Sequence, residues 1–195
     1  MGRSATITRS TKETDITVTL DLDGAAATSV ATGVPFFDHM LEALGRHGLL
    51  GLSVSATGDL AVDAHHTVED VGICIGQAIA QSLGDKTGIR RFGSAVVPMD
   101  EALVLAAVDV SGRGQLHYDV AVPIELIGSF DTTLAKEFMV ALATNAGITL
   151  HVRALVGENA HHIIEAAFKA LARALREACE PDPRVSGIPS TKGSL

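Results

Sequence analysis

The sequence predicts an α/β (α+β) fold of two homologous halves, each with the element order βββαβα, in which four helices lie between two mostly antiparallel sheets. Three observations predict it. The segment His65–Glu69 (HHTVE) recurs 96 residues later as His161–Glu165 (HHIIE). Segments that alternate apolar and polar residues precede each copy, and apolar residues at helical spacing follow it. Neither half could bury its helical face alone, so we expect the halves to pack with their helices inward.

The first half is predicted to span residues 1–93. Apolar and polar residues alternate between residues 5 and 23, which predicts two paired strands joined by a polar turn at 11–14. Gly33-Val34-Pro35 introduces the first helix, because proline is favoured in the first helical turn. The expected elements are strands at 5–10, 16–22 and 27–32, a helix at 36–48, a strand at 52–56 and a helix from His65, with Gly84, Gly88 and Gly93 marking the link to the second half.

The second half, residues 94–180, repeats this order. Its expected elements are strands at 102–110 and 116–122, a helix at 132–145, a strand at 148–154 and a helix at 161–180. Matching the strand 52–56 to 150–154 gives an offset of 98, which pairs His39 with Glu137, two potential metal ligands. Residues 181–195 are predicted to form a C-terminal tail rich in Pro, Gly and Ser. Such a tail suits a flexible end, and equally a loop that closes on phosphate.

Composition indicates the setting in which the chain works. The net charge of −8 argues against general nucleic-acid binding. No apolar run approaches the length of a membrane span, and the N-terminus lacks the basic and apolar regions of a secretory signal. We therefore expect a cytoplasmic protein that binds neither nucleic acid nor membrane. Cys74 and Cys179 fall within apolar helices and are predicted to be buried structural thiols.

The two HHxxE segments predict a metal site. On a helix the first histidine and the glutamate, at i and i+4, share a face, whereas adjacent histidine rings point about 100° apart. One helix can therefore offer ligands in two directions. Imidazole and carboxylate without thiolate suit Mn, Fe, Co or Zn. The candidate ligands are His65, His66, Glu69, His161, His162 and Glu165, to which the repeat adds His39 and Glu137.

Five motifs together resemble the imidazoleglycerol-phosphate dehydratase family of histidine biosynthesis, in its monofunctional form. They are FFDHM at 36–40, HHTVED at 65–70, SGR at 111–113, HHIIEA at 161–166 and PSTKG at 189–193. They follow the family's order from one end of the chain to the other. The resemblance implies a lyase that dehydrates D-erythro-imidazoleglycerol phosphate to imidazole acetol phosphate. It also implies two Mn(II) ions per subunit, shared between subunits of a 24-mer built from trimers.

The resemblance implies roles for individual residues. A substrate ring bound as an imidazolate by two metal ions would provide the electron sink that loss of the hydroxyl requires. Glu13 matches the family's candidate acid/base and contacts substrate. Glu137 stands where many relatives have His, and Ala43 where many have Gln. The matching metal ligands are His39, His65, His66, Glu69, Glu137, His161, His162 and Glu165, and the matching phosphate-binding residues are Arg91, Arg113, Lys169, Ser190 and Lys192.

Two other interpretations use the same ligands. A dinuclear-metal hydrolase acting on a phosphorylated small molecule would use them to generate hydroxide. A metal-storage protein of the ferritin type is disfavoured, because such bundles carry Glu-x-x-His in an all-helical fold, whereas here the order is reversed and strands precede each helix. Since His65 and His66 point apart, we expect neighbouring subunits to complete the sites.

Overall fold

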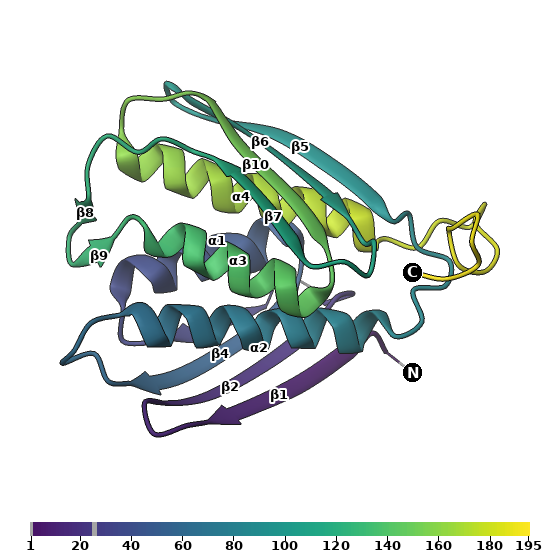
Figure 1. Cartoon of the computed structure of the whole chain (residues 1–195), viewed down its shortest axis with the longest axis horizontal. Coiled ribbons are helices and arrows are strands. Elements are labelled where there is room, and N and C mark those ends of the chain that lie inside the picture. The colour runs from purple at the N-terminus through teal and green to yellow at the C-terminus, as the bar shows by residue number, and fades with distance from the viewer. Residues whose placement is uncertain (1, 25–26) are drawn as a thin grey trace.

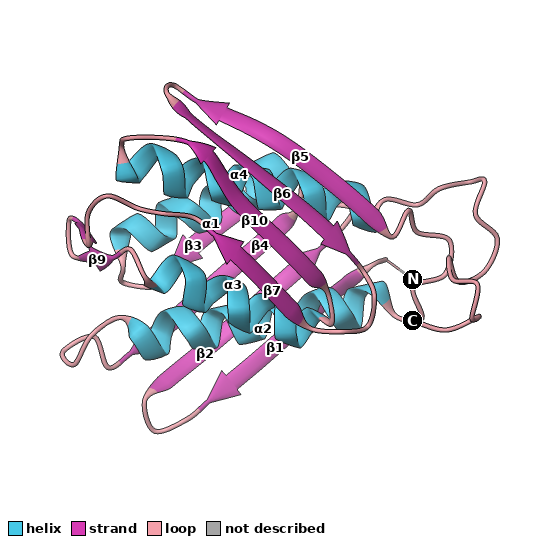
Figure 2. Ribbon diagram, turned by 45° about the horizontal axis from the view of Figure 1, so that its top comes forward, coloured by secondary structure: helices cyan, strands magenta, loops and turns pink. Residues whose placement is uncertain are grey.

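The computed structural model of the chain describes residues 2–24 and 27–195 as two sheets with four helices between them (Figures 1 and 2). The first half contains β1 (Ser4–Ser10), β2 (Thr14–Asp21), β3 (Thr28–Ala31), α1 (Pro35–Gly48), β4 (Gly51–Gly58) and α2 (His65–Leu83). The second half contains β5 (Phe92–Met99), β6 (Ala102–Asp109), β7 (Gln115–Asp119), β8 (Leu126–Ile127), β9 (Phe130–Asp131), α3 (Leu134–Ala146), β10 (Thr149–Val156) and α4 (Ala160–Cys179).

The topology confirms the predicted fold class and the equivalence of the two halves. The sheet orders are β1-β2-β4-β3 and β5-β6-β10-β7, so each strand of one sheet has a counterpart in the other. In each sheet two pairings are antiparallel and one, β3–β4 or β7–β10, is parallel. The first hairpins share their register as well, since Ser4 pairs with Asp21 and Phe92 with Asp109, an offset of 88 residues. That offset makes the turn residue Glu101 the counterpart of Glu13.

Three strands of the second half, β5 and the paired β8 and β9, were not expected. β5 occupies the predicted link and crosses the proposed boundary at residue 93. It lacks polar alternation, because its outward positions include the exposed Phe92 and Val96. Its inward-facing Gly93 lets the strand lie against α4, where a Cβ would come within 2.1 Å of the carbonyl oxygen of Ala174. The strand predicted at 116–122 ends at Asp119, and the short β8–β9 hairpin lies between it and α3, where no strand was predicted.

The helices form two facing layers. α1 packs on β3 and α2 on β1, β2 and β4, while α3 packs on β7 and α4 on β5, β6 and β10. Across the middle of the molecule, α1 faces α4 and α2 faces α3 (Figure 1). Phe37, Phe138 and Phe168 are fully buried between the layers. The predicted packing with helices inward is therefore confirmed.

All four helices begin at the same end of the molecule. β3, β4 and β10 are each followed by a helix that runs back over the sheet, and β7 is followed by the β8–β9 hairpin and then by α3. Both HHxxE segments therefore lie at the left in Figure 1. The C-terminal tail lies at the opposite end, on the right. At 1.5 Å per residue, the 20 residues of α4 separate the two ends by about 30 Å. Among the described residues, no helix is long and apolar enough to cross a membrane.

Candidate metal centre and cationic pocket

Three of the predicted ligands form a compact cluster. Nε2 of His39 lies 3.2 Å and Nε2 of His161 3.0 Å from Oε2 of Glu165. One ligand atom from each of the three residues lies within 4.8 Å of the others. His39 comes from α1 in the first half, and the other two come from α4 in the second half. The helix pairing described above therefore assembles ligands from both halves.

Neighbouring groups fix this cluster. The side chain of Asn159 accepts hydrogen bonds from the backbone N–H groups of His161 and His162, which caps the start of α4. The ring of Phe36 contacts that of His161 edge-on, with centroids 5.1 Å apart. Phe36 in turn packs against Phe130 of β9, with centroids 5.2 Å apart. The inserted hairpin thus supports the histidine ring.

Glu165 is held as a carboxylate. Its residue is 6% exposed. Burial alone would raise the pKa of Glu165, but hydrogen bonds from Lys169, His161 and His39 outweigh burial and lower the pKa to about 2. Nζ of Lys169 lies 2.7 Å from Oε1, leaving Oε2 to the two histidines. A metal cation could replace the protons that these rings now share with Oε2.

The counterpart residues in the other helix pair are more open. Nε2 of His65 lies 3.9 Å from Oε2 of Glu69, and both side chains are nearly half-exposed. Glu137 is half-buried on α3, which packs against α2. Within residues 2–24 and 27–195, His39, His161 and Glu165 are the one group of three potential ligands this close together. The structure thus places His65, Glu69 and Glu137 on facing helices without closing them into a cluster.

His66 and His162 point away from their neighbouring histidines, each toward a carboxylate that the sequence analysis missed. Nδ1 of His66 lies 3.0 Å from Oδ2 of Asp59, and Nδ1 of His162 lies 2.8 Å from Oε2 of Glu101. Hydrogen bonds that the ring N–H groups donate to these carboxylates raise the pKa of both histidines. A carboxylate at Nδ1 directs Nε2 toward a metal ion, which is the usual arrangement behind a metal-bound histidine. Nε2 of His162 lies 3.6 Å from Oδ2 of Asp100. Comparing the hairpins of the two halves could have revealed Glu101, because it is the counterpart of Glu13.

Glu13 lies on the side of α2 toward which His66 points. It occupies the turn between β1 and β2, and its Oε2 is 3.8 Å from Nδ1 of His66. Its side chain is 55% exposed, so water and small molecules can reach it. The turn lies at the same end of the molecule as the start of α2 (Figure 1). The structure therefore places the predicted acid/base beside a predicted ligand.

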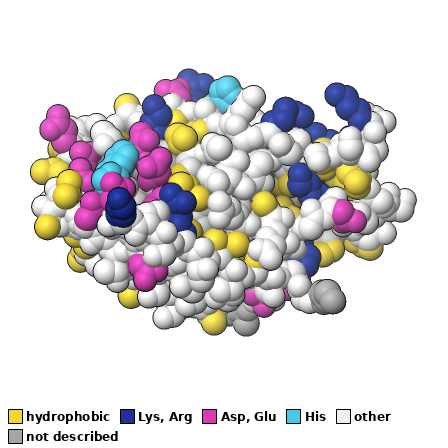
Figure 3. Space-filling model, turned by 60° about the horizontal axis from the view of Figure 1, so that its bottom comes forward, with side chains coloured by type: hydrophobic (Ala, Val, Ile, Leu, Met, Phe, Trp, Pro, Cys, Tyr) yellow, Lys and Arg dark blue, Asp and Glu magenta, His cyan; other side chains and the backbone are white. Residues whose placement is uncertain are grey.

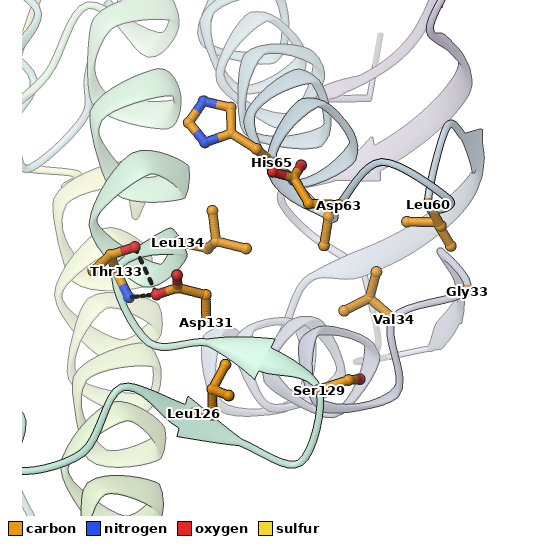
Figure 4. A pocket seen from close by; sticks show the side chains of 11 residues that line it. Gly33, Val34, Leu60, Asp63, His65, Leu126, Ser129, Asp131, Thr133 and Leu134 are labelled. Carbon is orange, nitrogen blue, oxygen red and sulfur yellow. Dashed lines mark hydrogen bonds between the residues drawn. The ribbon is translucent and has the colours of Figure 1, made fainter.

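A cavity of about 420 Å³ opens beside His65. It lies between the start of α2 and the β8–β9 hairpin, and Figure 4 shows Asp63 and His65 above Leu134, Val34 and Leu126. Further residues around it include Asp131, whose Oδ1 accepts hydrogen bonds from the N–H and hydroxyl groups of Thr133. Its walls are mixed, with apolar side chains beside the half-exposed histidine. His65 was a predicted ligand, but no sequence signal indicated the cavity around it.

Four of the five predicted phosphate-binding residues line one pocket of about 440 Å³ at the opposite end. They are Arg91, Arg113, Ser190 and Lys192. The guanidinium of Arg91 donates to the carboxylate of Asp109 at 2.8 Å and to the carbonyl oxygen of Pro189 at 2.8 Å. This contact ties the tail to the sheet. The fifth predicted residue, Lys169, lies instead on α4 beside Glu165.

The two sites therefore lie at opposite ends of one chain. On the face shown in Figure 3, acidic side chains surround a histidine at one end, and several Lys and Arg side chains lie at the other. Helices α2 and α4 separate them. The ligands for a metal and the cations for a phosphate thus belong to different ends of the same subunit.

Comparison with known proteins identifies the family. The model of the imidazoleglycerol-phosphate dehydratase family matches residues 32–175. The chain belongs to the imidazoleglycerol-phosphate dehydratase family. Imidazoleglycerol-phosphate dehydratases from Acidiphilium cryptum and Dinoroseobacter shibae are each 61% identical to it. The first alignment covers 100% of both chains, and the second covers 99% of this chain and 100% of the relative.

Solved structures of the same family share its fold. The imidazoleglycerol-phosphate dehydratase of Staphylococcus aureus superposes with a TM-score of 0.84 at 37% identity, covering 92% of this chain and 99% of the other. That of Pyrococcus furiosus, in complex with (S)-C348, also gives 0.84, at 41% identity, covering 97% and 100%. Membership of this lyase family sets aside the hydrolase interpretation. The two sheets set aside a ferritin-type bundle.

Proposed function

We propose that this chain dehydrates imidazoleglycerol phosphate to imidazole acetol phosphate in histidine biosynthesis, in the cytoplasm, with two Mn(II) ions per subunit. The observation that carries the proposal is the cluster of His39, His161 and Glu165 in a chain of the dehydratase family. Its donors are imidazole and carboxylate without thiolate, a set that suits Mn(II). The ionised, buried Glu165 supplies the negative charge that a cation needs.

Eight residues would hold the two ions. His39, His161 and Glu165 would bind one, and the open set of His65, Glu69 and Glu137 would bind the other. His66 and His162 point away from both sets. We therefore propose that each binds an ion held by the three-residue set of a neighbouring subunit, so that each ion is shared between two chains. The ions would supply Lewis acidity that stabilises negative charge on the substrate's ring. Glu137 in place of a histidine would add negative charge to its site.

Glu13 would move the proton. Its carboxylate is exposed, and its nearest charged neighbour is His66 at 3.8 Å. A general base must lie within hydrogen-bond reach of the proton that it removes. A substrate bound at His66 would lie beside this carboxylate. Lys169, which donates to Glu165 at 2.7 Å, would hold that ligand in place rather than bind phosphate in the distant pocket.

We infer that neighbouring subunits share each active site. The substrate consists of one imidazole ring, three carbons and a phosphate, so it is far shorter than α4. The metal ligands lie at one end of that helix, and the pocket of Arg91, Arg113, Ser190 and Lys192 lies at the other. A substrate held by metal ions and by this pocket would need at least two chains. This need supports the expected assembly of trimers into a 24-mer.

Metal-stripped protein tests the proposed function directly. It would be incubated with imidazoleglycerol phosphate, with and without Mn(II), and imidazole acetol phosphate would be followed. Product only in the presence of metal is the expected result. Metal uptake without product would refute the dehydratase activity, and product without metal would refute the metal requirement.

A further inference from the structure

A buried polar network lies beneath the turn that carries Glu13. The hydroxyl of Thr14 donates to Oδ2 of Asp70 at 2.6 Å, and both residues are buried. Nε of Arg9 lies 2.8 Å from Oδ1 of the same carboxylate and forms an ion pair with it. Asp70 follows the predicted ligand Glu69 directly on α2. The network thus connects β1, β2 and α2.

The second half shows that the fold does not require this network. The counterparts of Arg9, Thr14 and Asp70 are the apolar residues Val97, Ala102 and Ala166. Ala102 and Ala166 are buried, and the equivalent β5–β6 hairpin packs on the equivalent helix α4 with no charged or hydroxyl group at these three positions. Removing a carboxylate from water costs free energy that an apolar pair avoids. The buried charge in the first half therefore has a role other than holding the hairpin on the helix.

The network reaches the backbone of Glu13 through one further residue. Oγ1 of Thr11 lies 3.2 Å from Oγ1 of Thr14. Oγ1 of Thr11 also accepts hydrogen bonds from the N–H groups of Glu13 and Thr14, each at 3.0 Å. A continuous chain of contacts therefore runs from Asp70 through two hydroxyl groups to the backbone of Glu13.

The equivalent turn of the second half is held differently. Glu101 uses its own carboxylate, which accepts hydrogen bonds from the N–H groups of Glu158 and Asn159 and contacts His162. Glu13 makes no such contact among the described residues apart from its approach to His66 at 3.8 Å. The turn of the second half is thus anchored by the carboxylate of Glu101. The turn of the first half is anchored by Thr11 and Thr14, so the carboxylate of Glu13 is not used to hold it.

We propose that Asp70, acting through Thr14 and Thr11, is a positioning residue that holds the turn of Glu13 in place for proton transfer. Arg9 balances the buried charge. The inference rests on the proposed role of Glu13. It explains why the first hairpin carries Arg9, Thr14 and Asp70 at positions where the second has Val97, Ala102 and Ala166.

The variant Thr14→Val tests the proposal, because valine keeps the shape and removes the hydroxyl. We expect kcat to fall by about 10²-fold, the scale of a misplacement of about 1 Å in a catalytic group. KM, Mn(II) content and assembly size should stay unchanged. Hydrogen exchange in the peptide over residues 9–16 should become faster. Thr14→Ser, which keeps the hydroxyl, should restore both the rate and the protection.

A double variant separates positioning from general stability. If Thr14 acts through Glu13, then Thr14→Val should cost nothing further in a Glu13→Gln background, and an additive loss would overturn the proposal. Thr19→Val is the matched control, since Thr19 lies on the exposed face of the same strand and contacts Thr6. It should change neither rate nor exchange. Should Thr14→Val fail to assemble, Thr11→Val removes the second hydroxyl and leaves the buried pair intact.

Failure of the inference can be distinguished from failure of the proposed function. A slow Glu13→Gln variant together with a normal Thr14→Val variant would overturn the positioning role alone. A near-normal rate for Glu13→Gln would overturn the proposed role of Glu13 itself, and with it the inference that rests on that role.

Discussion

At the scale of single residues, Glu165 shows how neighbours determine ligand character. It is buried, yet three hydrogen-bond donors keep its pKa at about 2. The HHxxE spacing predicted that His161 and Glu165 share a face, and they do. The spacing could not predict that Lys169 would use the other carboxylate oxygen, because that contact depends on the side-chain conformation in the folded protein. For the same reason the sequence did not identify Asp59 as the partner of His66.

Glu165 makes the stability of the metal-free protein depend on pH. Its pKa is lower in the folded protein than the ordinary value of 4.5, so the ionised carboxylate stabilises the folded state above pH about 4.5. That contribution is lost as the pH falls toward 2. We expect the free energy of unfolding of the native protein to exceed that of Glu165→Gln most at pH 5. The difference should shrink between pH 5 and pH 2 in denaturant titrations of metal-free samples. A difference that stays constant over this range would contradict the account.

The two thiols are predicted to be unreactive in the folded protein. Burial raises the pKa of Cys74 to about 11 and that of Cys179 to about 12. The thiolate is the reactive form, and very little of it exists at pH 8. A thiol reagent should therefore modify neither residue in native protein and both in denaturant. Rapid modification of native protein would show that these helices open more readily than their packing indicates.

At the scale of elements, the helices were easier to predict than the strands. Helical periodicity and the proline at residue 35 located all four helices to within a few residues. β5 escaped prediction because its outer face carries apolar residues such as Phe92 and Val96, so the alternation that marks a half-buried strand is absent. The β8–β9 hairpin escaped because strands of two residues give no periodic signal. The facing of α2 and α3 is a tertiary property that local sequence does not specify.

The close approach of α2 and α3 depends on small residues. A Cβ on Gly76 would lie 2.6 Å from the carbonyl oxygen of Leu142 and 2.8 Å from Cβ of Asn145. Gly76→Ala should therefore force the helices apart and lower the free energy of unfolding by about 1–3 kcal/mol, less the small gain in helix propensity. Thermal unfolding of the metal-free protein and of the metal-free variant would measure this loss of stability. Gln81→Ala, on the exposed face of the same helix, is the control and should have little effect. Equal stability of both variants would contradict the close packing.

At the scale of the whole molecule, ligands and phosphate-binding cations lie at opposite ends. If metal ions join neighbouring subunits through His66 and His162, then chelation should break the assembly into smaller oligomers. Light scattering before and after removal of metal would measure the change. Restoring Mn(II) should restore the size. An assembly that keeps its size without metal would argue against ions shared between subunits.

Mixing two inactive variants tests the shared active site most directly. His161→Ala removes a predicted metal ligand and Arg113→Ala removes a cation of the distant pocket, so each variant alone should be inactive. Co-expressed in one assembly, some sites would combine an intact metal end from one subunit with an intact cationic end from another. We predict that the mixed assembly regains part of the dehydratase activity. Mixed particles that mass spectrometry detects but that remain inactive would contradict the central claim, which is that one active site combines the metal ligands of one subunit with the cationic pocket of another.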